Sequence, residues 1–166
     1  KKHSTDENRM LVRLKEKMHL WDLGQIDELQ FRQVISEITG VAEDKVWDTI
    51  WGTASVNEEI LVLIKKLKEK FKIVLFSDNF APYLQKQIDS LGIRNLFDKI
   101  IISSDHHVKK TDTKFFEILL STLGMSKDEV IFTDDSETNI KVANRFGIPS
   151  HLFTSVNEFE TFLKSF

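Results

Sequence analysis

The chain has 166 residues, of which 41% are hydrophobic and 30% are charged, and its formal net charge is −3. This length and composition are typical of a globular protein with a substantial core, and the slightly acidic balance disfavours a nucleic-acid partner. The absence of cysteine excludes disulfides, cysteine-ligated zinc and a thiol nucleophile and is typical of a reducing compartment, so we expect a cytoplasmic protein, with no apolar run long enough to span a membrane.

The first 55 residues are expected to be helical, because apolar residues recur at helical spacing and no strand pattern occurs. Residues 1–9 are polar, do not resemble a signal peptide and are expected to be frayed or to be the tail of an upstream segment. Turn residues Gly24 and Gly40 separate the predicted helices, which cover about 10–18, 27–39 and 43–51. Three tryptophans in this region could line a substrate pocket: Trp21, Trp47 and Trp51. The i, i+4 spacing of Trp47 and Trp51, however, favours helix packing for these two.

From residue 56 onward, short apolar runs alternate with helical patterns. The runs predict strands at 72–76, 99–103, 130–133 and 151–153. The patterns between and around them predict helices at about 57–70, 82–91, 113–123, 136–146 and 156–166, with a polar loop from 104 to 112. This alternation predicts an α/β fold with a doubly wound parallel sheet. We therefore expect a helical unit at 1–55 and an α/β unit at 56–166.

Polar residues follow three successive strands. Ser77 ends the first, Lys110 lies in the loop after the second, and Asp134 and Asp135 follow the third. Each alone has a plain explanation: a helix cap, a solvated lysine, or acids at a helix N-terminus. The carboxyl ends of parallel strands meet at one rim, however, where a hydroxyl, an ammonium and an acid pair can bind phosphate and Mg²⁺.

These residues carry a resemblance to the haloacid dehalogenase superfamily. The segments that resemble its second, third and fourth motifs are 75–79, 103–116 and 132–140. The N-terminal part is similar to the superfamily's small helical cap, with Gly24-Gln25-Ile26 followed by Phe31. Within the superfamily, the chain most resembles the branch that contains sugar-phosphate phosphatases and epoxide-hydrolase-associated phosphatases.

The resemblance implies Mg²⁺-dependent hydrolysis of a small phosphorylated metabolite through an aspartyl-phosphate intermediate. By this resemblance Ser77 would bind phosphate together with Asp78 and Asn79, and Lys110 would bind phosphate and steady the intermediate. Asp134 would ligate Mg²⁺ with the help of Asp135. Two positions depart from the usual motifs: Asp78 stands where asparagine is common, and Thr111 replaces a proline.

The superfamily's first motif, which supplies the nucleophilic aspartate, is missing. Asp22 superficially resembles it, but residues 15–19 are no buried strand and Asp22 immediately precedes the segment Gly24-Gln25-Ile26. The nucleophile strand should lie between the strands that end at Ser77 and Asp134, so its absence would leave two inner edges unpaired. We expect an N-terminal segment or a second chain to supply it, and the 166 residues alone to be inactive.

Two other functions remain open for this chain, and a third does not fit its sequence. The chain could be a non-catalytic relative that binds a phosphorylated ligand or a protein, or a haloacid dehalogenase, which needs the same missing aspartate. A response-regulator receiver domain does not fit, because there the acid pair follows the first strand. A metal shared by His106 and His107 is disfavoured, because adjacent side chains of an extended chain point apart.

Overall fold

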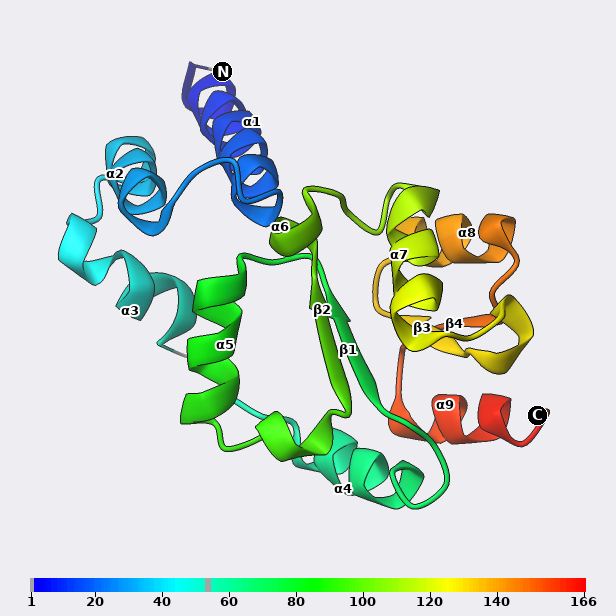
Figure 1. Cartoon of the computed structure of the whole chain (residues 1–166). Coiled ribbons are helices and arrows are strands. Elements are labelled where there is room, and N and C mark those ends of the chain that lie inside the picture. The colour runs from blue at the N-terminus through cyan, green and yellow to red at the C-terminus, as the bar shows by residue number, and fades with distance from the viewer. Residues whose placement is uncertain (1, 53–54) are drawn as a thin grey trace.

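The computed structural model describes residues 2–52 and 55–166, with side chains from residue 8 onward except at 50 and 51. It has the predicted α/β fold, with short parallel strands and surrounding helices (Figure 1). No helix in the described ranges is long and apolar enough to cross a membrane.

Residues 2–51 form helices and no strand, as the sequence predicts. They are α1 (Lys2–Asp22), α2 (Glu28–Thr39), a 3-10 turn (Glu43–Lys45) and α3 (Val46–Trp51). The prediction of a frayed start is wrong, because α1 extends back to Lys2. Residues 2–9 contain neither glycine nor proline, so nothing in the sequence interrupts the helix there. α2 begins with a reciprocal capping box between Asp27 and Gln30 and ends at Gly40 in the left-handed conformation.

An aromatic cluster joins these helices to the rest of the chain. Trp21 is 1% exposed, and its ring centroid lies 4.3 Å from that of Phe31 and 4.1 Å from that of Phe80. Trp47 stacks on Tyr83 at 4.6 Å. The Trp21 and Trp47 side chains therefore pack into the protein. For Trp47 this agrees with the helix packing predicted from its spacing with Trp51, whose side chain lies outside the described part.

The α/β part begins with α4 (Glu58–Leu67). The strands are β1 (Val74–Ser77), β2 (Lys99–Ile102), β3 (Phe132–Asp134) and β4 (Ser150–Leu152). The other helices are α5 (Ala81–Ser90), α6 (Ser103–His106), α7 (Thr113–Leu123), α8 (Glu137–Phe146) and α9 (Val156–Leu163), with 3-10 turns at Arg94–Leu96 and Lys127–Glu129. The predicted strand 99–103 thus ends one residue early, at Ile102, and the one-turn helix α6 occupies Ser103 and the start of the predicted loop at 104–112. A single turn is too short to show helical periodicity in the sequence.

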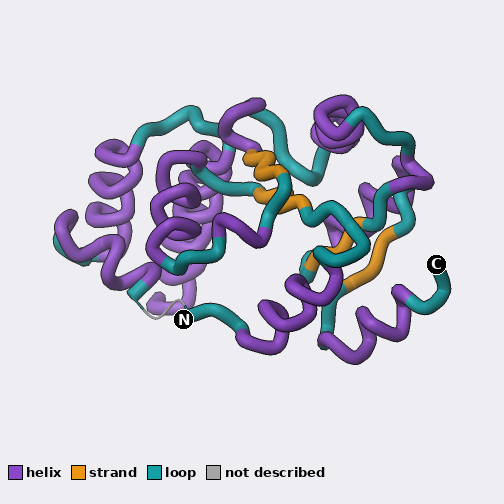
Figure 2. Tube along the Cα trace, turned by 60° about the horizontal axis from the view of Figure 1, so that its bottom comes forward, coloured by secondary structure: helices purple, strands orange, loops and turns teal. Residues whose placement is uncertain are grey.

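The four strands form two separate parallel pairs. β1 pairs with β2, with Ser77 opposite Ile102, and β3 pairs with β4, with Asp134 opposite Leu152. Figure 2 shows the two pairs as separate groups of orange strands. Within the described residues, no strand joins β1 to β3, so the structure is consistent with a missing central strand. All four residues of β1 are only half-buried, although their apolar sequence predicts a buried strand.

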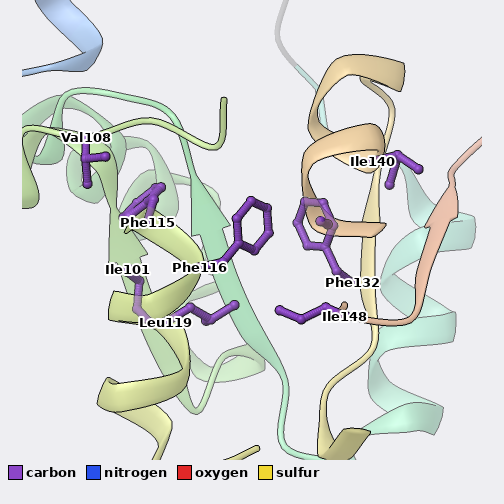
Figure 3. Close-up of a cluster of buried hydrophobic side chains, with 9 residues drawn as sticks. Ile101, Val108, Phe115, Phe116, Leu119, Phe132, Ile140 and Ile148 are labelled. Atoms are coloured by element: carbon purple, nitrogen blue, oxygen red, sulfur yellow. The ribbon is translucent and has the colours of Figure 1, made fainter. Parts of the chain in front are cut away.

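Side chains, rather than backbone hydrogen bonds, connect the two pairs. Phe116 of α7 is fully buried and meets Phe132 of β3 edge to face, at 5.3 Å between ring centroids (Figure 3). Phe76 of β1 lies 5.4 Å from Phe116 and 6.1 Å from Phe132. The main core is therefore a shared ring cluster under α7, which holds both strand pairs.

Candidate functional site

The carboxyl ends of β1 and β3 are joined by one ion pair. Lys110 Nζ lies 2.5 Å from Asp134 Oδ2 and donates to the Phe76 carbonyl at 3.4 Å. The two charged side chains are 12% and 6% exposed. A desolvated pair such as this is costly to bury, so its place at the strand ends marks a candidate functional site. The structure thus brings Lys110 and Asp134 together at one rim, where the sequence places them.

Helix α8 holds the other oxygen of Asp134. Asp134 Oδ1 accepts hydrogen bonds from the Ser136 N–H at 2.8 Å and from Asn139 Nδ2 at 3.1 Å. Ser136 is also the N-cap of α8, because its side chain accepts from the Asn139 N–H. Sequence reasoning did not assign a role to Asn139. The sequence signal that could have indicated a role is the position of polar Asn139 on the helix face that also carries buried Ile140 and Ala143.

Asp78 holds the backbone of Lys110. Its Oδ1 accepts a hydrogen bond from the Lys110 N–H at 3.0 Å. Burial raises the pKa of the Asp78 carboxyl, as does the charge of Asp22, whereas the Lys110 N–H and the charges of Lys110 and Lys109 lower it. The net direction is upward. The Asp78 side chain is therefore engaged in a hydrogen bond that holds the loop carrying Lys110.

Asn79 and Ser77 have different surroundings. Asn79 Oδ1 accepts from the Phe80 N–H at 2.8 Å, and the Asn79 N–H donates to Ser103 Oγ at 2.9 Å. These contacts fix the turn after β1. Ser77 is half-buried at the end of β1, one residue beyond the carbonyl to which Lys110 donates. Of the three residues predicted to bind phosphate here, Asp78 and Asn79 use side-chain oxygens for contacts with nearby backbone N–H groups, whereas Ser77 lies at the strand end next to the Lys110 contact.

The predicted metal ligands are present but do not complete a site. Asp135 is exposed, and one oxygen of Asp134 is paired with Lys110. The described residues contain no group of three or more histidine, cysteine or acidic side chains placed to hold a metal ion. Mg²⁺ takes six oxygen ligands in octahedral geometry and usually one or two carboxylates. The acid pair can contribute to such a site, but the described residues alone do not form it.

Asp22 and the adjacent histidines lie at a neighbouring junction. The Asp22 carboxylate pairs with Lys109, the residue before the site lysine. His107 Nδ1 contacts the Leu23 carbonyl at 2.7 Å, and the His106 ring lies 6.0 Å from that of Phe115. The two imidazoles therefore have separate partners.

The fold and the site together define a Rossmann-type α/β protein with a buried lysine–aspartate pair at the carboxyl ends of its parallel strands. The haloacid dehalogenase-like hydrolase family matches residues 2–153, and the chain belongs to this family. The match covers both the N-terminal helices and the site residues Ser77, Lys110 and Asp134.

Relatives support the phosphatase branch of the family. A phosphoglycolate phosphatase of Yersinia pseudotuberculosis is 34% identical over 77 residues, which are 46% of this chain and 33% of that protein. The chain thus spans only a third of that relative's length. A family enzyme from Bacteroides thetaiotaomicron has the same fold, with a TM-score of 0.81 at 23% identity over 95% of this chain and 82% of that one. A mutant of that enzyme was crystallised with magnesium and inorganic phosphate; its TM-score is 0.73 at 24% identity, over 84% and 76% of the two chains.

Proposed function

We propose that this chain provides most of a Mg²⁺-dependent hydrolase of small phosphomonoesters that works through an aspartyl-phosphate intermediate. The observation that carries the proposal is the desolvated pair of Lys110 and Asp134 at the carboxyl end of two strand pairs, beside Ser77. The phosphoglycolate phosphatases among the relatives support a small anionic substrate.

In this proposal, Ser77 and Lys110 bind the phosphoryl oxygens. The Ser77 hydroxyl donates a hydrogen bond, and the Lys110 ammonium neutralises charge that develops during phosphoryl transfer. Asp78 and Asn79 shape the binding loop from behind, through the contacts to Lys110 and Ser103. Asp134 and Asp135 contribute to a Mg²⁺ site, where a bound ion would neutralise phosphoryl charge.

The proposed nucleophile lies outside the 166 residues. An aspartate oxygen would form a bond to phosphorus while the ester oxygen leaves, and water would then hydrolyse the acyl phosphate. Among the described residues β1 pairs only with β2 and β3 only with β4, which supports a strand between β1 and β3, from an N-terminal segment or a second chain, that carries this aspartate and a further Mg²⁺ ligand. The helices α1–α3 would act as a cap over the rim and exclude water.

The test compares the 166-residue chain with the full product of its gene. Both are assayed for hydrolysis of 4-nitrophenyl phosphate and phosphoglycolate with Mg²⁺ and with chelator. We expect no turnover by the 166-residue chain and Mg²⁺-dependent turnover by the full product, abolished by Lys110→Met or Asp134→Asn. Turnover by the 166-residue chain that Asp134→Asn abolishes would refute the external nucleophile. Phosphate binding without turnover by the full product would instead identify a binding module.

A further inference from the structure

Two consecutive lysines make the two most buried ion pairs of the described chain. Lys109 pairs with Asp22, and these side chains are 18% and 15% exposed; Lys110 pairs with Asp134. Every other ion pair between described residues has both side chains at least 33% exposed. The segment that follows β2 is therefore held by two ion pairs. Lys109 binds Asp22 at the end of α1, and Lys110 binds Asp134 at the candidate site.

Three further contacts fasten the end of α1 to the same segment. Ser103 Oγ donates to the Asp22 carbonyl at 2.5 Å and accepts from the Asn79 N–H at 2.9 Å. His107 Nδ1 must carry its proton and donate to the Leu23 carbonyl at 2.7 Å, because a carbonyl only accepts. At Gly24, a Cβ atom would lie 2.9 Å from the Ser104 carbonyl oxygen. Only glycine therefore allows this close approach.

His107 also carries backbone strain at this junction. Its φ of 54° lies in the left-handed region, and it is the one non-glycine residue of the described chain with positive φ. Such a conformation is unfavourable for a residue with a side chain and persists where surrounding contacts fix it. The hydrogen bond to Leu23 is such a contact. The α1 end therefore helps to determine the backbone of the segment that leads to Lys110.

We propose that Asp22 is a positioning residue, whose ion pair with Lys109 places Lys110 at the phosphate site and so couples the position of α1 to that of the site lysine. The inference rests on the proposed function only for the role of Lys110. A desolvated pair is weak evidence of stabilisation by itself, because burying the charges costs much of what their attraction returns. Its value here is geometric: Lys109 is fixed on one side, and the next residue is fixed by Asp78 and Asp134 on the other.

The test measures hydrogen exchange of the Lys110 amide, which donates to Asp78, in the 166-residue chain. We expect Asp22→Asn and Lys109→Met each to reduce its protection about tenfold, in line with coupling between contacting groups. The amide of Ile140, which donates to the Ser136 carbonyl in α8, should be unchanged. The exchanged pair Asp22→Lys with Lys109→Asp should restore protection to within about threefold of the original.

Lys86→Met is the matched control. Lys86 pairs with Glu28 across the same boundary between the N-terminal helices and the α/β part, but its side chain is 71% exposed. We expect this variant to leave the Lys110 amide unchanged. Tryptophan emission, to which buried Trp21 contributes, reports whether each variant keeps α1 docked. If a single variant unfolds, the exchanged pair must refold and protect Lys110.

The proposal is overturned if the single variants affect the Lys110 amide no more than Lys86→Met does, or if the exchanged pair restores nothing. Neither measurement needs turnover or bound phosphate, so a failure of the proposed function leaves this result interpretable. If the full gene product is active, Asp22→Asn should lower kcat more than it raises KM, because a displaced Lys110 stabilises the transition state less.

Discussion

Replacing Lys110 by methionine tests whether the site is built on a desolvated charge. Methionine keeps the apolar stem but removes the ammonium 2.5 Å from Asp134. Asp134 would keep its hydrogen bonds from Ser136 and Asn139 but lose its counter-ion, at 6% side-chain exposure. Breaking one side of a buried pair costs about 3–5 kcal/mol, so Lys110→Met should destabilise the chain by this amount.

A second substitution separates the charge from the packing. Adding Asp134→Asn removes the uncompensated carboxylate, while the asparagine oxygen can still accept the Ser136 N–H. We expect the double variant to lie within about 1 kcal/mol of the original protein, because a neutral hydrogen-bonded group replaces a charged one. The control is Lys66→Met, which breaks the exposed Lys66–Glu160 pair and should cost less than about 1 kcal/mol.

Urea unfolding at pH 7, followed by far-ultraviolet circular dichroism, gives the free energies of unfolding of the original protein and of the three variants. The slope of each transition must be unchanged for the midpoints to be compared. The reasoning is refuted if Lys110→Met costs no more than Lys66→Met, or if the double variant is no more stable than Lys110→Met alone. Either result would mean that the fold does not desolvate Asp134.

Substitutions at three further positions test other parts of the structure. Burial raises the pKa of Asp78, so the ionised carboxylate is disfavoured in the folded state. Asp78→Asn removes this charge and should raise the urea midpoint at pH 7. The gain should vanish as the pH falls below the ordinary pKa of 3.8, where the carboxyl is protonated in both states. An equal gain at both pH values would contradict this. His107→Gly should be about 1 kcal/mol more stable to urea than His107→Ala, since both lose the bond to Leu23 but only glycine relieves the positive φ. Trp21→Ala should cost about 3–5 kcal/mol in thermal or urea unfolding, because the ring is 1% exposed; a loss below 1 kcal/mol would contradict its place in the core.

The elements that could be predicted from sequence are those with local signals at both ends. α8 is an example: Ser136 caps its start, Gly147 ends it in the left-handed conformation, and an apolar face lies between. α6 could not be predicted in this way. Its four residues are too few to show a period, and Ser103 and Ser104 are held by contacts with distant residues such as Asp22 and Ala81.

The candidate site was predictable in position but not in detail. Lys110 and Asp134 follow strands whose carboxyl ends share a rim, so topology alone brings them together. The direction of a side chain in a loop has no comparable signal. Asp78 and Asn79 were therefore grouped with Ser77 as phosphate ligands, whereas their side chains hold the Lys110 and Phe80 N–H groups. Their proposed role accordingly moves from direct binding to support of the loop.

The ring cluster explains how two strand pairs stay together without a shared hydrogen-bonded sheet. Val74 and Phe76 are two residues apart in β1 and so share one face of the strand. Both pack against the core that contains Phe116 and Phe132. This core covers one face of both pairs and uses no backbone hydrogen bonds. A strand between β1 and β3 would use their free edges and could leave the ring cluster in place. Insertion of that strand should therefore bury the half-exposed β1 and complete the site without rearranging the core that already positions Lys110 and Asp134.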